Sequence, residues 1–352
     1  MAKLNEICKI NMGQSPDSSS YNESGQGIPF FQGNADFGEL HPNVRVWCTA
    51  PTKIANPNDI LISVRAPIGA LNIANIKCCI GRGLAALTIN NNICDQKYLW
   101  YALESKVGEL NSKGTGSTFK AISKNILCDT EIALPSLNVQ KDISLVLDKI
   151  TTMIKLKQNQ LSKLDQLVKS RFIEMFGDPL VNDKCYPSEN GKSLFAFSSG
   201  KFLCEAKRKD DGIPVYGGNG IAWHTDDALI DFSTIIIGRV GAYCGNVKIV
   251  KEPVWITDNA IYIKEFKTDK FNLDFLYMLM TYLNFSQYAD FSGQPKVTQK
   301  PLETVQYIIP PIDLQNQFAE FVEQTDKLKF EVKEALEKLE ILKKSLMQQY
   351  FG

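Results

Sequence analysis

The chain contains two copies of one pattern, and this internal repeat constrains the fold more than any other feature of its 352 residues. The segments 164–177 and 339–352 are identical at six of fourteen positions, with a constant offset of 175 residues. The same offset relates Pro-x-Leu-x-x-Gln at 135–140 to Pro-x-Ile-x-x-Gln at 310–315. Neither one large domain nor two unrelated domains produces such a match, so we predict two similar units of about 175 residues each.

Each unit shows the same internal order. It begins with a head of short β-branched runs broken by glycine, proline and asparagine, a pattern typical of strands joined by turns. A helical stretch (97–110 and 273–284) and a proline then precede one long helix. We therefore predict an α+β fold, in which two similar mixed α/β heads are separated by two long helices and related by a pseudo-twofold internal repeat. The predicted domains are a first head at 1–134, a first long helix at 135–177, a second head at 178–309 and a second long helix at 310–352.

Both predicted long helices carry apolar residues at alternating spacings of four and three, which is the period of a coiled coil. Neither helix can bury its stripe alone, and the order of the chain sends the second helix back along the first. We therefore predict an antiparallel coiled coil with one head at each end, and a helix length of roughly 50 Å. The predicted interface residues are Ile150, Ile154, Leu161, Leu164 and Val168 in the first helix and Leu328, Val332, Leu339, Leu342 and Leu346 in the second.

The chain lacks the motifs of common catalytic sites. It has two histidines and nine cysteines, none at zinc-ligand spacing, and it has no dinucleotide fingerprint or phosphate-binding loop. We therefore predict a non-catalytic recognition protein with no metal site. The absence of a signal peptide or apolar span predicts a cytoplasmic protein without a membrane partner. The cysteines are then expected to be reduced and mostly buried, with Cys78 and Cys79 on opposite faces of one strand.

Polar loops occur at matching places in the two heads, in the glycine-rich tracts 114–120 and 292–298. Their hydroxyl, amide and ammonium groups are suited to phosphate and base-edge contacts in DNA, although a solvated loop explains them as well. The candidate DNA-binding residues in these tracts and at their edge are Lys113, Thr115, Ser117 and Lys120 in the first head and Ser292, Gln294 and Lys296 in the second.

Further candidates follow strands that the repeat matches between the heads. Arg65 and Arg239 each end a buried-looking strand, 59–65 and 233–239, and are suited either to reading guanine or to pairing with a carboxylate. A second pair of repeated loops contributes further polar candidates, of which the glutamine and asparagine amides can read adenine, although turn formation explains the asparagines equally well. These candidates are Gln32, Asn34, Tyr216, Asn219 and His224.

Three features together give the chain a resemblance to a known family. They are the Gly-Gln-Ser-Pro element at 13–16 with Gly-Lys at 200–201, the proline entry to each long helix, and the exit Phe-Gly-Asp-Pro at 176–179. With these features the whole chain resembles the specificity (S) subunit of type I restriction–modification systems. The second head departs from the pattern, because Gly-Lys-Phe stands at 200–202 where the first head has Gly-Gln-Ser. The chain is also compact and starts almost at once with the first head, so a related methylation-only or partner-type S protein is an open alternative.

The resemblance implies that each head is a target recognition domain reading one half of a bipartite, asymmetric site in double-stranded DNA. The coiled coil would set the spacer and dock two methyltransferase (M) subunits that use S-adenosylmethionine. Restriction (R) subunits would add cleavage that depends on ATP and Mg²⁺. No cofactor is expected in this chain itself.

The charge balance bears on this reading, because the chain has 39 basic and 39 acidic residues. No segment is strongly basic, so we expect the isolated chain to bind DNA weakly while the methyltransferases supply most phosphate contacts. Two other classes stay open: a coiled-coil adaptor with two protein-binding heads, and an enzyme with an atypical site. Sequence-specific, salt-sensitive binding of a duplex distinguishes the DNA reader from the adaptor.

Overall fold

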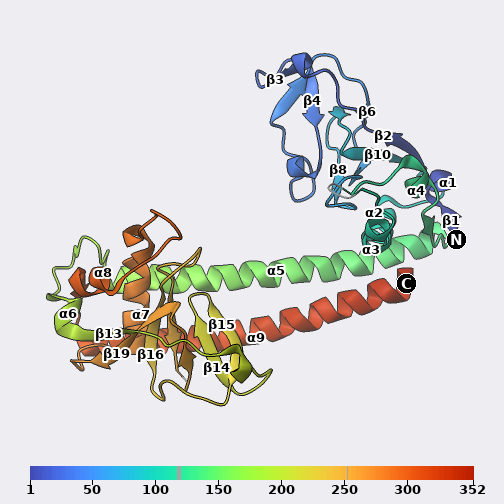
Figure 1. Ribbon diagram of the computed structural model, residues 1–352. Coiled ribbons are helices and arrows are strands. Elements are labelled where there is room, and N and C mark those ends of the chain that lie inside the picture. The colour runs from blue at the N-terminus through green and yellow to red at the C-terminus, as the bar shows by residue number, and fades with distance from the viewer. Residues whose placement is uncertain (117–119, 252) are drawn as a thin grey trace. The chain divides into compact units, whose positions relative to one another are not determined.

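The computed structural model describes residues 1–116, 120–251 and 253–352. They form two compact units, Met1–Gln158 with Ala335–Gly352, and Asn159–Glu334. Each unit contains one head and parts of two 40-residue helices, α5 (Leu137–Phe176) and α9 (Ile312–Phe351) (Figure 1). These helices lie within the predicted segments 135–177 and 310–352, and the predicted α+β class is confirmed. No helix in the described ranges is long and apolar enough to cross a membrane.

The head of the first unit, head 1, is built on two sheets. The central strand β7 (Ile60–Ser63) is buried on both faces, because Ile60 and Ile62 pack in one apolar cluster and Leu61 in another. The four-stranded sheet has the order β2 (Cys8–Met12), β10 (Leu84–Ile89), β7 (Ile60–Ser63) and β8 (Leu71–Ile73), and the five-stranded sheet the order β3 (Tyr21–Asn22), β5 (Val46–Cys48), β4 (Ile28–Phe31), β9 (Cys78–Ile80) and β6 (Ile54–Ala55). The remaining elements are β1 (Ala2–Lys3), which pairs with β11 (Glu131–Ile132), and α1 (Leu4–Ile7), α2 (Gln96–Ser105), α3 (Val107–Ser112) and α4 (Lys124–Cys128).

The head of the second unit, head 2, repeats this topology with fewer strands in the outer sheet. Its four-stranded sheet has the order β13 (Phe195–Ser199), β19 (Ala260–Phe266), β16 (Thr234–Gly238) and β17 (Val247–Val250). The outer sheet has the order β15 (Gly220–Thr225), β14 (Ile213–Gly217) and β18 (Trp255–Ile256), and β12 (Ser188–Asn190) pairs with β20 (Gln306–Ile308). Its helices are α6 (Gly191–Leu194), α7 (Leu273–Tyr282) and α8 (Gln299–Thr304). The sequence repeat is therefore a repeat of strand order.

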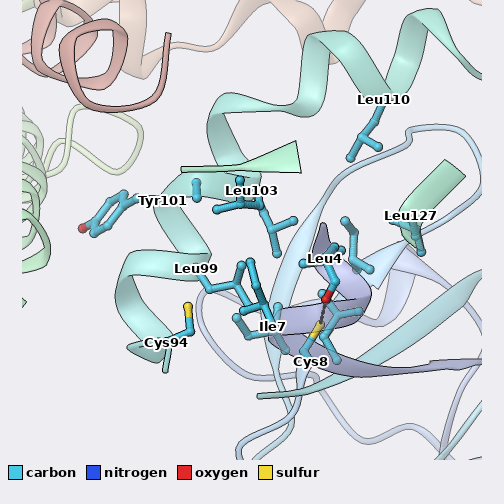
Figure 2. Close-up of a cluster of buried hydrophobic side chains, with 14 of the residues drawn as sticks. Leu4, Ile7, Cys8, Cys94, Leu99, Tyr101, Leu103, Leu110 and Leu127 are labelled. Atoms are coloured by element: carbon cyan, nitrogen blue, oxygen red, sulfur yellow. Dashed lines mark hydrogen bonds between the residues drawn. The ribbon is translucent and has the colours of Figure 1, made fainter. Parts of the chain in front are cut away.

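The main core of the first unit joins head 1 to both long helices. Figure 2 shows Leu4 and Ile7 of α1 beside Leu99 and Leu103 of α2. Residues from the start of α5, Ile143 and Leu147, and from the end of α9, Leu346 and Phe351, belong to the same cluster. The two helix segments in this unit therefore run antiparallel where they pack on the head.

The main core of the second unit is rich in aromatic rings. Phe172, near the end of α5, lies 5.0–5.6 Å between ring centroids from Phe176, Phe275, Tyr282 and Phe318. Phe318 comes from the start of α9, so the helix segments are antiparallel in this unit as well. The units also share one ring contact: the last phenylalanine of a long helix meets α2 in one unit (Phe351 with Tyr98, 5.2 Å) and α7 in the other (Phe176 with Phe275, 4.6 Å).

A buried glutamine at the start of each long helix ties that helix to its head. Gln140 accepts a hydrogen bond from Asp95 N–H at 2.9 Å and donates to Ile93 O at 3.0 Å and Pro135 O at 2.8 Å. Gln315 makes the same three bonds, accepting from Asn272 N–H at 2.9 Å and donating to Lys270 O at 2.9 Å and Pro310 O at 2.8 Å. Both side chains are fully buried. Each glutamine therefore fixes the proline entry and the start of the head's helix together.

Two residues of the expected apolar stripe of α9 are exposed within this chain. Leu328 and Leu342 are 51% and 46% exposed, whereas Val332 is buried and Leu339 and Leu346 are half-buried. The inward positions are instead taken by Lys329, which pairs with Asp165 at 2.9 Å, and Lys343, which pairs with Glu104 at 3.0 Å. A lysine can bury its apolar stem while its ammonium group reaches an acid, so apolarity alone does not identify which residues of α9 face inward within this chain. In α5, Ile150 and Val168 are buried and Ile154, Leu161 and Leu164 are half-buried, as expected.

All nine cysteines are free thiols, and six of them are buried. Cys78 and Cys79 belong to separate apolar clusters, which confirms that they lie on opposite faces of β9. Burial raises the pKa of Cys8 and Cys94 to about 12, so both thiols stay protonated at neutral pH. In Figure 2 the Cys8 thiol donates to Leu4 O, at 3.2 Å. These cysteines pack as apolar groups.

Candidate nucleic-acid interface

Four loop segments of head 1 are joined side by side by backbone hydrogen bonds, and we call them loop ladder 1: residues 31–33, 81–83, 64–66 and the described part of 115–122. Gly83 N–H donates to Gln32 O at 3.1 Å, and Val64 N–H donates to Gly83 O at 2.9 Å. Ile122 N–H then donates to Val64 O at 2.9 Å. Segments far apart in sequence thus meet at one place on the head.

Loop ladder 1 brings together several of the predicted DNA-binding residues. The side chains of Gln32, Arg65, Thr115 and Lys120 are all exposed on it. Ser117 lies outside the described residues. These groups offer amide, guanidinium, hydroxyl and ammonium hydrogen bonds, as contacts to DNA require.

Two other candidates of head 1 lie beside this ladder. Lys113 ends α3, where its ammonium group donates to Glu109 at 2.5 Å and holds the pKa of Glu109 below its ordinary value. Asn34 is half-buried and begins the 3₁₀ turn Asn34–Asp36. Formation of this turn therefore explains in part why an asparagine stands at position 34. A DNA phosphate would have to compete with Glu109 for the ammonium group of Lys113.

Head 2 has an equivalent loop ladder 2, formed by residues 216–218, 257–259, 239–241 and 290–297. Thr257 N–H donates to Tyr216 O at 2.9 Å, and Arg239 N–H donates to Asn259 O at 2.8 Å. Val297 N–H donates in turn to Arg239 O at 2.8 Å. The predicted residues that lie on this ladder are Tyr216, Arg239, Ser292, Gln294 and Lys296.

Two predicted residues of head 2 belong to the β14–β15 hairpin. Asn219 is exposed in the turn next to the ladder. His224 is half-buried near the open end of the hairpin, where it pairs with Pro214 and with the backbone of Lys209. The structure therefore places Asn219 with loop ladder 2 and His224 apart from it.

The hydrogen bonds correct the expected match between the two heads. Val64 and Arg239 make the same backbone contacts, so the equivalent of Arg65 is Val240 and not Arg239. The backbone bridge between Thr115 and Ala121 likewise has its equivalent in the bridge between Asp290 and Lys296, at the offset of 175 residues. The expected match of tract 114–120 with tract 292–298 is therefore shifted by three residues. Short apolar runs can be aligned in more than one register, and only the backbone pairing selects one.

The two arginines consequently have different surroundings. Arg65 is exposed, whereas Arg239 is half-buried and donates through Nη1 to Asp258 O at 3.2 Å. Within the described ranges neither guanidinium forms an ion pair with a carboxylate. The alternative of structural pairing with an acid therefore does not hold for them there.

Arg82 and Ser15 are polar residues of loop ladder 1 and its border that the sequence analysis did not select. Arg82 is exposed in the turn between β9 and β10, and its backbone N–H donates to Ser15 Oγ at 3.3 Å. The only sequence signal for this turn is the glycine on either side of Arg82. Without the fold, nothing indicates that the turn lies next to Gln32.

Loop ladder 2 is not a simple phosphate clamp. Asp290 accepts a hydrogen bond from Ser292 N–H at 2.8 Å, which lowers the pKa of Asp290. An ionised carboxylate repels phosphate but can accept a hydrogen bond from a base amino group. Lys296 and Asp290 share a backbone bridge, so the two charges lie at the same place on the ladder. The mixture of donors and acceptors favours contacts to base edges.

Comparison with known proteins finds similar chains in one family. A family model described as "Type I restriction modification DNA specificity domain" matches residues 1–166 and 192–342. A putative type I restriction enzyme MjaX specificity subunit of Methanocaldococcus jannaschii is 44% identical over 161 residues, which cover 46% of this chain and 38% of that relative. The EcoprrI specificity subunit of Escherichia coli is 23% identical over 92% of this chain and 87% of its own length.

A solved structure has the same fold. The type I restriction–modification S subunit of M. genitalium superposes with a TM-score of 0.66 and 18% identity, covering 99% of this chain and 95% of that one. At this identity the match supports the fold alone.

Proposed function

Because the chain belongs to the family of type I restriction–modification DNA specificity proteins, we propose that it is the DNA-reading subunit of such a complex. In this proposal each head reads one half of a bipartite, asymmetric site in double-stranded DNA. The observation that carries the proposal is the pair of loop ladders, which share their backbone hydrogen bonds but hold different side chains. A shared scaffold with different polar groups is what two readers of two different half-sites require.

The chemistry then belongs to partner subunits, and this chain is non-catalytic. Methyltransferase subunits bind S-adenosylmethionine and methylate the DNA, and restriction subunits supply cleavage that depends on ATP and Mg²⁺. The near balance of charge supports this division, because a chain without a strongly basic segment neutralises few phosphates by itself. The complex acts in the cytoplasm, where its DNA is.

The long helices support docking of the two methyltransferase subunits. Several large apolar side chains on them are exposed and are therefore available for contact with a partner subunit. They are Leu145, Met153, Leu156 and Leu167 on α5 and Leu328, Phe330, Ile341 and Leu342 on α9. In this reading Leu328 and Leu342 serve the partner subunit.

Co-expression with a type I methyltransferase subunit tests the proposed function. We expect the two proteins to co-purify and the host genome to acquire methyladenine at one bipartite motif, measured by long-read methylome sequencing. The methyltransferase expressed alone is the control and should leave that motif unmethylated. Genomic DNA with no new bipartite motif, despite a stable complex, would contradict the proposal.

The spacer between the half-sites is expected to depend on the length of the long helices. Four residues inserted between Gln158 and Asn159, and four between Glu334 and Ala335, lengthen each helix by about 6 Å and by about one turn. Because B-DNA rises 3.4 Å per base pair, the spacer should grow by about two base pairs with both half-sites unchanged. The same insertion between the exposed Asp210 and Asp211 is the control. If the methylated motif keeps its spacer, the helices do not set it.

A further inference from the structure

The turn Gly81-Arg82-Gly83 places an arginine at a hollow of about 380 Å³ on head 1. Its backbone is fixed against the end of β4, because Gly81 N–H donates to Phe31 O at 2.8 Å and Gly83 N–H to Gln32 O at 3.1 Å. A Cβ at Gly81 would lie 2.6 Å from Gln32 Oε1, and one at Gly83 would lie 2.6 Å from Gln32 O. Glycine on both sides of Arg82 therefore permits an approach that a larger residue would prevent.

Ser15 connects this turn to the side chain of Gln32. Arg82 N–H donates to Ser15 Oγ at 3.3 Å, and Ser15 Oγ donates to Gln32 Oε1 at 3.1 Å. The stacked rings of Tyr21 and Phe30, 4.7 Å apart at 23°, line the same hollow. Ser15, Gln32 and Arg82 thus line one hollow together with Asp36 and an apolar wall.

In the described part of the chain, hydrogen bonds fix the backbone of Arg82 but not its guanidinium group. Its side chain is exposed, and within the described ranges no carboxylate or carbonyl pairs with it. Arg45, whose partner Asp36 lines the same hollow, is different: it pairs with Asp36 and donates to Ala35 O at 3.1 Å. Arg45 therefore stabilises the loop. The N–H donors of the Arg82 guanidinium are instead available to bind a ligand with two hydrogen-bond acceptors.

Head 2 has the same backbone at this place. β4 pairs with β9 in parallel as β14 pairs with β18, with Phe31 opposite Ile80 and Tyr216 opposite Ile256. The preceding loop is held alike, since Gln14 N–H donates to Ile80 O at 3.0 Å and Lys201 N–H to Ile256 O at 2.8 Å. From these bonds the equivalent residues are Arg82 and Asp258, Gln32 and Gly217, and Ser15 and Phe202.

All three side chains therefore differ where the backbones agree. We propose that Arg82 reads a guanine in the half-site bound by head 1, and that Asp258 reads a cytosine at the equivalent place in the half-site bound by head 2. An arginine fork fits the O6 and N7 acceptors of guanine in the major groove, and a carboxylate accepts from the N4 amino group of cytosine. This inference rests on the proposed function and adds the residues that choose the bases.

The test uses the full chain co-expressed with its methyltransferase and a methylome readout. Arg82→Ala should relax one guanine position of one half-site, with a loss of preference for guanine there of about 5- to 150-fold. Arg82→Lys keeps the charge without the fork and should relax the same position. Asp258→Ala should relax a cytosine position in the other half-site and leave the first unchanged.

Lys9→Ala is the matched control, because it removes one exposed positive charge from head 1 on β2, away from the turn. Co-purification with the methyltransferase shows that each variant is folded. An unchanged motif for Arg82→Ala, a uniform fall in methylation without a change of preference, or relaxation of the same half-site by both Arg82→Ala and Asp258→Ala would each overturn the assignment. If the wild-type chain directs no bipartite methylation, the proposed function itself fails, and that result is distinct from an unchanged motif.

Discussion

Replacing Gln140 by leucine is expected to destabilise the first unit by about 3 kcal/mol or more. The substitution leaves one N–H and two carbonyl groups, all at least partly shielded by the Gln140 side chain, without these partners, and an unpaired group costs about 1–3 kcal/mol where water cannot replace the bond. Leucine fills much of the volume of glutamine, so the added apolar contact offsets only part of this cost. Gln315→Leu should destabilise the second unit by a similar amount, because its three bonds are the same. Chemical denaturation measures both effects.

Hydrogen exchange locates the damage. Gln140→Leu should speed exchange at the backbone around Asp95, and Gln315→Leu should speed it around Asn272, with the other unit little changed. Gln158 and Gln317 lie on the same helices but are exposed, so replacing either by leucine should change stability by less than about 0.5 kcal/mol. Equal losses for the buried and exposed glutamines would show that the three buried bonds do not hold the helix to its head.

The repeat made much of the fold predictable from the sequence. A constant offset of 175 residues identifies the two units, and Gln140 and Gln315 keep that offset because each must satisfy the same three backbone groups. The α9 stripe was less predictable. Leu328 and Lys329 are adjacent, and the choice between them depends on Asp165, an acid on the other long helix. The period of apolar residues in the sequence does not indicate that Asp165 lies opposite Lys329.

The segments that form the candidate site could be predicted from the sequence, but the residue-by-residue match between the two heads could not. Gln32, Arg65 and Lys120 were selected from separate segments, and the backbone bonds of loop ladder 1 bring these segments together. Arg82 could not be predicted as a DNA-binding residue from the sequence. Its place in the candidate site depends on the contact between its turn and Gln32, fifty positions earlier in the chain. Such a long-range contact leaves only a trace in sequence, the two glycines that make room for it.

A chain that carries head 1 twice is expected to recognise half-site one at both ends of its DNA site. Residues 190–309 would be replaced by a copy of residues 3–134, because Lys3 and Asn190 are the N-cap residues of the first helix in each head. The native connection 178–189 after α5 is kept. The copied head should dock, because Gln315 can make its three bonds to the equivalent backbone and Phe176 can replace Phe351 against the copied Tyr98. The predicted pseudo-twofold repeat makes the two half-sites an inverted repeat.

The helix under the copied head needs two adjustments. Head 1 packs on Ile143 and Leu147, whereas the equivalent positions of α9 hold Phe318 and Val322. Phe318→Ile and Val322→Leu restore the matching surface, since a core packed for isoleucine accepts a phenylalanine only at a cost of about 1–3 kcal/mol. The acid that meets the copied Lys97 is kept, because Glu323 stands where the first unit has Asp148.

Methylome sequencing reads the outcome directly. The bases of half-site two should disappear from the motif and those of half-site one should occupy both ends, a complete change of specificity with the methyltransferase unchanged. The reciprocal chain with two copies of head 2 should give the other symmetric motif. The wild-type chain carrying only Phe318→Ile and Val322→Leu is the control, and it should keep the asymmetric motif. Two loop ladders that share a backbone scaffold can read two sequences only through the side chains that differ. If half-site two persists in a folded chain without head 2, recognition is therefore not divided between the heads.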